Sequence, residues 1–346
     1  MITIYDLAKQ TGFSAPTISK ALNGNGKLSE ETRQIILEAA KKAGYTANMA
    51  AKALSTKHSR LIGVILEDIA MGRGFEHPLF GGLLNKFRGE IELAGYDLLF
   101  LSKKFNSGMS YIDHCRYRDV EGILIVNPID DDEEIKTLGS CGIPCVSTNE
   151  FIPGVCTVVS DNETAGRTAA QVFHDYGHTK IAFLGAPFRE NSPAAIERYK
   201  GFKEEIGSYG LAFDEQYLEI CEAWWDQAGY DGMKKLYERC PDITAVFVVC
   251  DALAFGAMKY LLEIGKSIPD DISIIGFDDD TTVLKAAPTL STFRQDRDKI
   301  AQLASEMLLQ EIAGIPRPEI VRVPAQYIAR SSVRRFTNIH RMAFVQ

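Results

Sequence analysis

The sequence has no apolar run that approaches the roughly 18 residues needed to span a membrane. Its longest apolar stretches, such as Leu61–Leu66 and Ala245–Cys250, have the length of buried strands. The N-terminus lacks the basic segment followed by an apolar segment that is typical of a secretory signal. The seven cysteines are odd in number and lack the spacing of a disulfide framework. We therefore expect a cytoplasmic protein with reduced thiols and no membrane partner.

Positive charge is concentrated at the N-terminal end. Residues 1–60 contain nine Lys and Arg against four Asp and Glu, a net charge of +5, whereas the other 286 residues contain 29 against 42, a net charge of −13. A small basic segment on an acidic body suggests that only this segment meets a polyanion. A chance fluctuation of surface charge would give the same numbers, so charge alone leaves both interpretations open.

The first sixty residues have the spacing of four short helices. Thr3 and Asp6 form a variant capping box at the start of the first helix, and Gly12 suits its C-terminal end. Ser14 is a suitable N-cap for a second helix over Ala15–Leu22. Two helices joined by a Gly-containing turn of about four residues are typical of a helix-turn-helix, whose second helix enters the major groove of DNA.

The second helix has an outward set of residues that could contact base edges. These are Ala15, Pro16, Thr17, Ser19 and Lys20, while Ile18 and Leu22 face the core. Lys20 can donate to guanine O6 and N7, and Ala15 or Thr17 can contact a thymine methyl group. A helical hairpin without a DNA role would have the same spacing, so that alternative stays open.

Two further helices are expected before the body of the chain. Ser29 is a suitable N-cap for the third, which has acidic residues in its first turn and Gly44 at its end. The fourth covers residues 48–55 and has Asn48 as its cap. Eight residues are too few for a helix that is stable alone in water, so this segment needs a partner to order it.

These segments resemble the N-terminal domain of the lactose/galactose repressor (LacI/GalR) family. The matching residues are ITIYDLA at 2–8, SAPTISKALNG at 14–24, SEETR at 29–33 and GYTAN at 44–48, without gaps. The resemblance implies that operator DNA is contacted by Thr3, Ser14, Ala15, Pro16, Thr17, Ser19, Lys20, Asn23, Asn48, Ala51 and Leu54. The chain has Lys20 where the family usually has Arg and Ala47 where it usually has Pro. Residues 15 and 16 would help to set operator preference, and because Ala15 and Pro16 offer no donor there, apolar contact or DNA shape must carry more of the readout.

The resemblance also assigns a role to the fourth helix. In the family the matching segment is a hinge helix that orders on operator DNA and pairs with its twin in the minor groove. Leu54 matches the position that inserts between base steps and kinks the DNA. The alternative is that Leu54 is a linker residue covered by the body of the protein.

The body alternates apolar strands with helices. Strands are expected at 61–66, 96–101, 122–126, 144–147, 181–185, 217–221, 245–250 and 273–277, and helices near 79–94, 108–117, 132–140, 161–176, 193–209, 226–239 and 251–265. This alternation predicts an α/β core with two doubly wound parallel sheets, each with a ligand crevice at the carboxyl ends of its strands. A cleft between two such lobes would hold one small molecule.

Motifs along the body extend the resemblance over nearly the whole chain. They are HPLF at 77–80, SDNETAG at 160–166, GHTKI at 177–181, RYKGF at 198–202 and IPDDISIIGFDD at 268–279. The family core is similar to periplasmic sugar-binding proteins, and the chain crosses between its lobes three times. We expect a DNA-binding domain at 1–57 with its hinge helix at about 48–55, and a core at 58–346 for effector binding and dimerisation. Lobe 1 would comprise about 58–158 and 290–322, and lobe 2 about 159–289 and 323–335, with crossings near 159, 290 and 322.

Six residues are candidates for effector binding. Arg198 and Asp278 match positions at which the family holds a sugar or a purine, and a guanidinium with a carboxylate can pair with adjacent ligand hydroxyls. Phe80 and Trp224 could form flat walls against a sugar ring. Asn149 and Cys250 occupy matching positions but differ from residues used elsewhere in the family. The alternatives are a salt bridge between Arg198 and Asp278, and a core role for the two aromatic residues.

The leading hypothesis is a DNA-binding transcriptional regulator of the repressor type that works as a homodimer on pseudo-palindromic operator DNA. A small effector, a sugar or sugar derivative, would control its operator affinity. The alternative is a cytoplasmic sugar-binding protein without a DNA function. We expect no enzyme activity, no cofactor and no metal site, because no nucleophile–base spacing is present and Gly177 separates His174 from His178 at a helix end.

Overall fold

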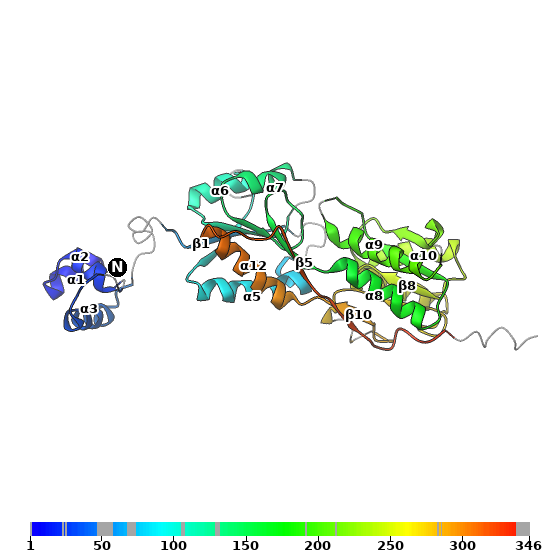
Figure 1. Ribbon diagram of the computed structural model, residues 1–346. Coiled ribbons are helices and arrows are strands. Elements are labelled where there is room, and N and C mark those ends of the chain that lie inside the picture. The colour runs from blue at the N-terminus through cyan, green and yellow to red at the C-terminus, as the bar shows by residue number, and fades with distance from the viewer. Residues whose placement is uncertain are drawn as a thin grey trace, which may run out of the picture. The chain divides into compact units, whose positions relative to one another are not determined.

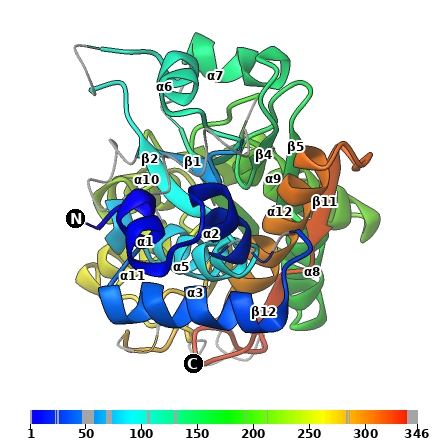
Figure 2. The ribbon, with the colours of Figure 1, turned by 90° about the vertical axis from the view of Figure 1, so that its left-hand side faces the viewer.

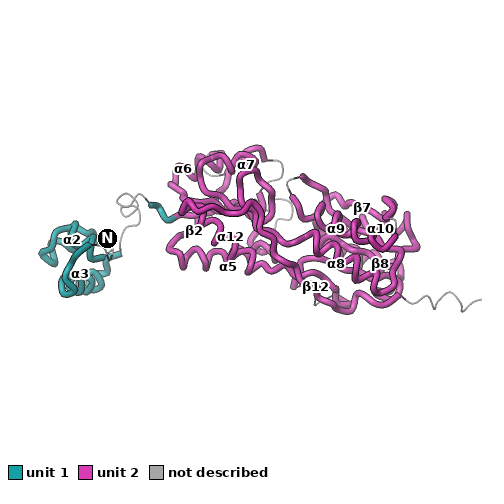
Figure 3. Tube along the Cα trace, viewed as in Figure 1, with its two compact units in different colours: residues 1–60 teal, residues 61–346 magenta. Residues whose placement is uncertain are grey.

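The computed structural model describes residues 2–22, 24, 26–46, 58–67, 74–104, 108–128, 132–190, 192–211, 213–281, 284 and 286–336. The chain divides into two compact units, residues 1–60 and residues 61–346 (Figure 3). Among the described residues, no helix combines the length and the apolar character needed to cross a membrane.

The first unit is a three-helix head around a small apolar core. Its helices are α1 (Ile4–Thr11), α2 (Ala15–Leu22) and α3 (Glu30–Ala43). The expected capping box is confirmed, because the Thr3 backbone N–H donates to Asp6 Oδ2 at 2.9 Å and the Asp6 N–H donates to Thr3 Oγ1 at 3.3 Å. Leu7, Ile18 and Ile36, one from each helix, are fully buried together. The helical head predicted from the spacing is therefore present.

The second unit begins with a parallel six-stranded sheet. Its strands are β1 (Leu61–Leu66), β2 (Asp97–Leu101), β3 (Gly122–Asn127), β4 (Cys145–Ser147), β5 (Cys156–Ser160) and β11 (Ile320–Val323), in the order β11-β5-β4-β3-β1-β2 (Figure 2). Since β11 comes from near the end of the chain, the first lobe is assembled from separate segments.

Helices cover both faces of this sheet. They are α5 (Pro78–Leu93) and α12 (Arg297–Ile312) on one face, and α6 (Tyr111–Arg118) and α7 (Glu133–Thr137) on the other (Figure 1). Side chains of β1 alternate between the two layers as strand geometry requires. Ile62 and Val64 pack in one cluster with Phe87 of α5, whereas Ile65 packs in the other with Tyr111 of α6. Short 3₁₀ helices occupy Gly74–Glu76 and Leu138–Ser140.

The second lobe is built on a parallel four-stranded sheet. Its strands are β6 (Ile181–Gly185), β7 (Leu218–Ile220), β8 (Ala245–Val248) and β9 (Ser273–Ile275), in the order β7-β6-β8-β9, with helices α8 (Asn162–Asp175), α9 (Pro193–Ser208), α10 (Asp226–Arg239) and α11 (Asp251–Glu263), and a 3₁₀ turn at Glu215–Tyr217. Helix α8 packs against α9, and α10 packs against α11. Two lobes with parallel sheets and helices confirm the predicted fold class.

The chain passes between the lobes three times. The passages follow β5, the short strand β10 (Thr292–Arg294) and β11; β10 pairs antiparallel with β12 (Gln326–Ile328). The second crossing, expected near residue 290, lies a few residues later along the chain. Leu290 and Phe293 are fully buried in the core of the second lobe, so the chain leaves this lobe only after Arg294.

Candidate functional site

Helix α2 presents one face to solvent in the head. Ser14 caps this helix, because the Thr17 N–H donates to Ser14 Oγ at 3.4 Å and the two hydroxyls lie 2.9 Å apart. Ile18 is fully buried and Leu22 packs against the same core, as expected. Pro16 and Lys20 are exposed on the outward face. The remaining outward candidates, Ala15, Thr17 and Ser19, are half-buried.

Gly26, which follows α2, lies against the side chain of Lys20. Gly26 has φ +84°, and a Cβ built on it would come within 3.2 Å of Lys20 Cδ. The positive φ is what favours a glycine at this position. The aliphatic stem of Lys20 therefore lies along the turn while the residue as a whole stays exposed, as is usual for a lysine.

Several residues of the predicted DNA interface lie outside the described part of the chain. These are Asn23, Asn48, Ala51 and Leu54, together with the hinge helix expected at 48–55. Their roles stay predictions. Thr3, the remaining candidate, is exposed at the start of α1 and its hydroxyl donates to Asp6 Oδ2 at 2.7 Å.

A cavity of about 900 Å³ lies between the two lobes and is large enough for a small molecule. All six candidate effector residues border it: Phe80, Asn149, Arg198, Trp224, Cys250 and Asp278. Phe80 and Asn149 come from the first lobe and the other four from the second. Asn149 follows β4, Trp224 follows β7, Cys250 follows β8 and Asp278 follows β9, so the cavity lies at the carboxyl ends of the strands, as expected for parallel sheets.

Arg198 is fixed by three contacts within the second lobe. It is 3% exposed, its Nε donates to Asn162 Oδ1 at 2.9 Å, and its Nη1 donates to the Val249 carbonyl at 2.6 Å. Its guanidinium lies 3.4 Å from the ring centroid of Phe277, which is a cation–π contact. Burial lowers the pKa of Arg198 to about 10, with the charge of Asp278 opposing this effect, so the guanidinium stays protonated at neutral pH. These hydrogen bonds use Nε and Nη1, so Nη2 can donate to a further acceptor such as a ligand.

Close packing of α8 and α9 sets the position of Arg198. A Cβ on Gly166 would lie 2.2 Å from the Arg198 carbonyl oxygen, and a Cβ on Gly201 would lie 2.0 Å from the Glu163 carbonyl oxygen. Only glycine allows the two helix backbones to come this close. The absence of a side chain at these two positions therefore brings the backbone of Arg198 against α8.

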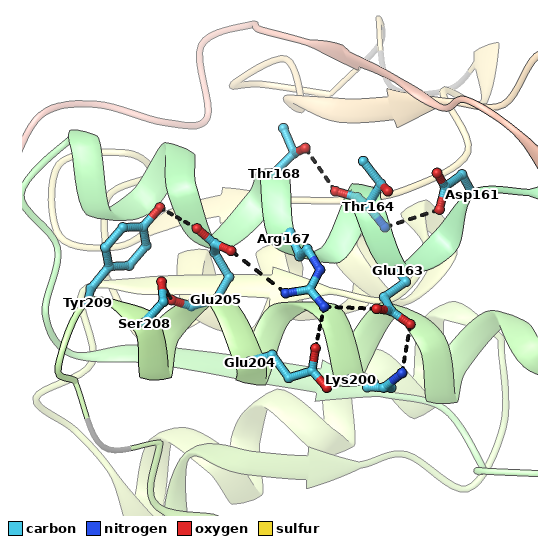
Figure 4. A network of polar contacts seen from close by, with 10 residues as sticks. All are labelled: Asp161, Glu163, Thr164, Arg167, Thr168, Lys200, Glu204, Glu205, Ser208 and Tyr209. Carbon is cyan, nitrogen blue, oxygen red and sulfur yellow. Dashed lines mark hydrogen bonds and ion pairs between the residues drawn. The ribbon is translucent and has the colours of Figure 1, made fainter.

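A polar network ties the same two helices together at their surface (Figure 4). Arg167 of α8 lies in its centre, where its guanidinium contacts Glu163, Glu204 and Glu205. Lys200 Nζ of α9 donates to Glu163 Oε2 at 2.9 Å. Because these groups are partly exposed, each pair adds little to stability, although the network spans both helices at their surface.

Asp278 lies at a backbone position that L-residues rarely adopt, with φ +125°. Its Oδ1 accepts a hydrogen bond of 2.7 Å from Gln295 Nε2. Burial raises the pKa of Asp278 to about 6, although the positive charge of Arg198 opposes the rise. Asp251, beside it, is buried, and its carboxylate accepts from the Thr292 hydroxyl at 2.6 Å and from the Asp280 N–H at 3.0 Å. Burial raises the pKa of Asp251 as well.

The alternative interpretation, a salt bridge between Arg198 and Asp278, does not hold, because the two side chains do not form an ion pair with each other. Each group has its own neutral partners, Asn162 for the arginine and Gln295 for the carboxylate. Both charged groups border the cavity, so they remain able to meet a ligand there.

The remaining candidates form apolar and polar parts of the wall. Phe80 is buried in the core of the first lobe and stacks on His77 with ring centroids 4.3 Å apart. Trp224 is half-buried against the core of the second lobe, and its carbonyl accepts from Cys250 Sγ at 3.8 Å. Burial raises the pKa of the Cys250 thiol, which keeps it neutral. Asn149 Nδ2 donates to Asn127 Oδ1 at 3.5 Å and to Glu150 Oε1 at 3.4 Å.

Sequence reasoning missed several polar residues of this cavity. Glu67, Asn127 and Glu150 follow or end strands of the first lobe, and Gln295 lies on the second passage between the lobes. Their places at the carboxyl ends of β1, β3 and β4 were a usable signal for the first three. Within the described ranges, no group of three or more His, Cys, Asp or Glu side chains is arranged to hold a metal ion.

Comparisons with known proteins agree with this arrangement. The model for the lacI family of bacterial regulatory proteins matches residues 3–48, and the model for the periplasmic binding protein-like domain matches residues 170–333. The ribose operon repressor of Bacillus subtilis is 30% identical over 338 residues, which cover 97% of this chain and 99% of that protein. The chain belongs to the lacI family of bacterial regulatory proteins. This lacI-family chain is a DNA-binding transcriptional regulator and not an enzyme.

Two solved structures are similar over most of this lacI-family chain. The lac repressor dimer bound to operator and an anti-inducer has a TM-score of 0.81 at 23% identity, covering 96% of this chain and 99% of that one. A LacI family regulator from Enterococcus faecium with bound ribose has a TM-score of 0.66 at 26% identity, covering 80% of this chain and 100% of that one. The first supports the fold of the head and the fold of the core, each by itself, and the second supports the fold of the two-lobed core.

Proposed function

We propose that this regulator is a cytoplasmic repressor that binds a pseudo-palindromic operator as a homodimer and releases or tightens its hold when a sugar binds between the lobes. The observation that supports the sugar site is the single cavity bordered by all six predicted residues from both lobes. The exposed outward face of α2 supports the operator site. A two-fold dimer reads two half-sites in opposite orientation, hence the pseudo-palindrome.

Operator readout is assigned to α2 and its flanks. Lys20 donates to a guanine, while Ala15 and Pro16 make apolar contacts that select by base methyl groups and DNA shape. Thr3, Ser14, Thr17 and Ser19 position the helix on the phosphate backbone. Asn23, Asn48, Ala51 and Leu54 complete this interface through the turn and the hinge helix.

A duplex selected from a random library by the full-length protein tests this assignment. Its affinity, measured by fluorescence anisotropy, is expected to fall linearly with salt on a log–log plot, with a slope of about −0.9 per phosphate neutralised. Lys20→Ala is expected to weaken binding about tenfold and to relax selection at one base pair. Lys42→Ala, which removes an exposed lysine from the last turn of α3, is the matched control. A flat salt dependence would contradict DNA binding through the basic head.

The sugar site supplies the regulation. A ligand shifts operator affinity only as far as it binds the two arrangements of the lobes unequally. The names of the relatives point to ribose for two of them. A thermal-shift screen of sugars and nucleobases against the full-length protein is therefore the direct test, since a ligand at 100 times its Kd adds about 2.7 kcal/mol of stability. A sugar that binds without changing operator affinity would favour a sugar-binding protein without a regulatory role for the cavity.

A further inference from the structure

The wall of the effector cavity carries an excess of negative charge. Among the described residues that border it, eight are Asp or Glu and four are Arg, which gives a formal balance of −4. With the buried Asp251 counted as protonated and with Arg330, which pairs with Asp279, included, the balance is −2. Charges gathered around a cavity with low-dielectric walls act together on whatever enters it. The cavity wall therefore has a net negative formal charge, which acts on any charged ligand.

Three of the four arginines are already bound to groups of the protein. Arg198 donates to Asn162 and to the Val249 carbonyl, Arg294 Nε lies 2.7 Å from Asp279 Oδ2, and Arg297 Nη1 donates to the Pro78 carbonyl at 2.9 Å. Asp279 is further neutralised by Arg330, which contacts its second oxygen. Of these three, Arg294 is compensated by a carboxylate, whereas Arg198 and Arg297 have neutral partners and keep their positive charge. The carboxylates nevertheless outnumber the arginines on this wall.

The carboxylates face the cavity from both lobes. Glu67 follows β1 and Glu150 follows β4 in the first lobe, whereas Asp278 and Asp280 follow β9 in the second. Each ionised carboxylate has about four lone-pair sites. Glu67 accepts a hydrogen bond from the Tyr111 hydroxyl at 3.3 Å, and Asp278 accepts from Gln295 and from the backbone of Asp251, so both keep lone pairs for a ligand. These carboxylates therefore supply acceptors for ligand hydroxyl groups on both sides of the cavity.

A ligand that fits this wall has hydrogen-bond donors for its carboxylates and carries no negative charge of its own. Sugar hydroxyl groups donate to carboxylates in charge-assisted hydrogen bonds. A phosphate or carboxylate on the sugar would bring negative charge next to negative charge while losing its own hydration, which is unfavourable on both counts. The raised pKa of Asp278 points in the same direction, because burial and the neighbouring charge of Asp280 already disfavour its own ionised form.

We propose that the cavity selects sugars without negative charge and excludes sugar phosphates and uronic acids. This inference rests on the proposed function, namely that a sugar binds between the lobes. It narrows the effector to a neutral sugar whose hydroxyls donate to Glu67 and Glu150 on one side and to Asp278 and Asp280 on the other.

Calorimetry on the full-length protein at pH 7.5 and 50 mM salt tests the inference with matched pairs. The pairs are D-ribose with D-ribose 5-phosphate, D-glucose with D-glucose 6-phosphate, and D-galactose with D-galacturonate. In the pair whose neutral member binds, the anion is expected to bind at least 100-fold more weakly. Tighter binding of an anionic member would overturn the charge selection and leave the sugar site intact. If neither neutral nor anionic sugars bind, the proposed function itself fails.

Two further measurements separate charge from size. 6-O-Methyl-D-glucose carries a neutral group at the position of the phosphate, and it is expected to bind better than D-glucose 6-phosphate. The double variant Glu67→Gln with Glu150→Gln is expected to reduce the discrimination between neutral and anionic sugar about tenfold, whereas Glu306→Gln, an exposed change on α12 outside the cavity, leaves it unchanged. Equal discrimination in the folded double variant would overturn the assignment of selection to these carboxylates.

Salt provides the same test without mutation. Raising the salt concentration from 50 to 500 mM shortens the screening length severalfold, so the wild-type preference for the neutral sugar is expected to narrow. A preference that does not change with salt, together with weak binding of 6-O-methyl-D-glucose, would mean that the cavity excludes the phosphate by its size.

Discussion

Gln295 and Asp278 are joined by a hydrogen bond of 2.7 Å from the glutamine Nε2 to the carboxylate Oδ1. The other end of the same glutamine, Oε1, accepts from the Ser160 hydroxyl at 2.6 Å. Ser160 ends β5, where the chain first leaves the first lobe, and Gln295 lies where it returns. One side chain thus connects a candidate effector carboxylate with two of the three passages between the lobes.

Replacing Gln295 is expected to weaken both sugar binding and the effect of bound sugar on operator affinity. Gln295→Leu removes the donor to Asp278 and the acceptor for Ser160, so sugar affinity should fall about tenfold and the effect of sugar on operator affinity should shrink. Calorimetry and anisotropy measure the two quantities. Gln302→Leu, which removes an exposed hydrogen bond to Glu306 on α12, is the control. If sugar changes the operator affinity of Gln295→Leu as much as that of the wild type, the hydrogen bonds of Gln295 do not couple the sugar site to DNA binding.

Sugar binding is expected to weaken in mild acid because of Asp278. Burial raises its pKa to about 6 from 3.8, so the carboxylate that accepts sugar hydroxyls is present above pH 6 and is lost below it. Affinity should be level above pH 7 and about tenfold lower at pH 5. Asp278→Asn should bind more weakly at pH 7 and show a flat profile. A wild-type profile as flat as that of the variant would exclude Asp278 as the titrating group.

The raised pKa of Asp278 affects the folding stability of the unliganded protein in the opposite direction from sugar affinity. The folded state binds a proton at Asp278 more readily than the unfolded chain does, so this contribution is fully present below pH 3.8 and is lost as the pH rises through about 6. Ligand affinity and unliganded stability should therefore change in opposite directions over this window when wild type is compared with Asp278→Asn.

Much of the fold could be predicted because most strands are short apolar runs. Leu61–Leu66 and Ile181–Gly185 were placed at their observed bounds for this reason. Strand β5, Cys156–Ser160, was missed because Thr157 and Ser160 interrupt its apolar pattern, although all five residues are buried. Burial on both faces of a parallel sheet removes the alternation that would otherwise mark a strand.

The candidate site was predictable only in part, because its members depend on tertiary position to different degrees. Arg198 and Asp278 were found through their family motifs, and Glu67 and Glu150 lay at strand ends that a stricter use of topology would have identified. Gln295 gave no signal in the sequence. Its role depends on where the chain leaves the second lobe, and that is decided by the burial of Leu290 and Phe293 in the core of this lobe.

An ion pair between the lobes is expected to influence sugar affinity. Arg322 of β11 in the first lobe donates two hydrogen bonds, of 2.8 and 2.6 Å, to Glu197 of α9 in the second. Because the arginine is partly exposed, a double-mutant cycle of Arg322→Gln and Glu197→Gln is expected to give a coupling of only about 0.5–1 kcal/mol in urea unfolding. Each single variant should weaken sugar binding two- to fivefold, because the pair is present in the arrangement that forms the cavity.

A pair within one lobe provides the control for this prediction. Arg317 Nε lies 2.6 Å from Glu311 Oε2, and both residues belong to the first lobe. Arg317→Gln should lower stability and leave sugar affinity within twofold of wild type. If Arg322→Gln and Arg317→Gln change sugar affinity equally, the ion pair between the lobes does not stabilise the sugar-binding arrangement.

The contact between α8 and α9 is expected to tolerate no side chain at residue 201. A methyl group on Gly201 would lie 2.0 Å from the Glu163 carbonyl oxygen, a backbone atom that cannot move without separating the helices. Gly201→Ala should therefore destabilise the protein by about 2–4 kcal/mol and displace Arg198, which lies one turn earlier on α9. Gly207→Ala is the matched control, because the same methyl group on the same helix meets nothing within 4 Å and should add up to about 1 kcal/mol of stability. Urea unfolding of the two variants measures the difference, and equal midpoints would show that α8 and α9 do not pack through their glycines.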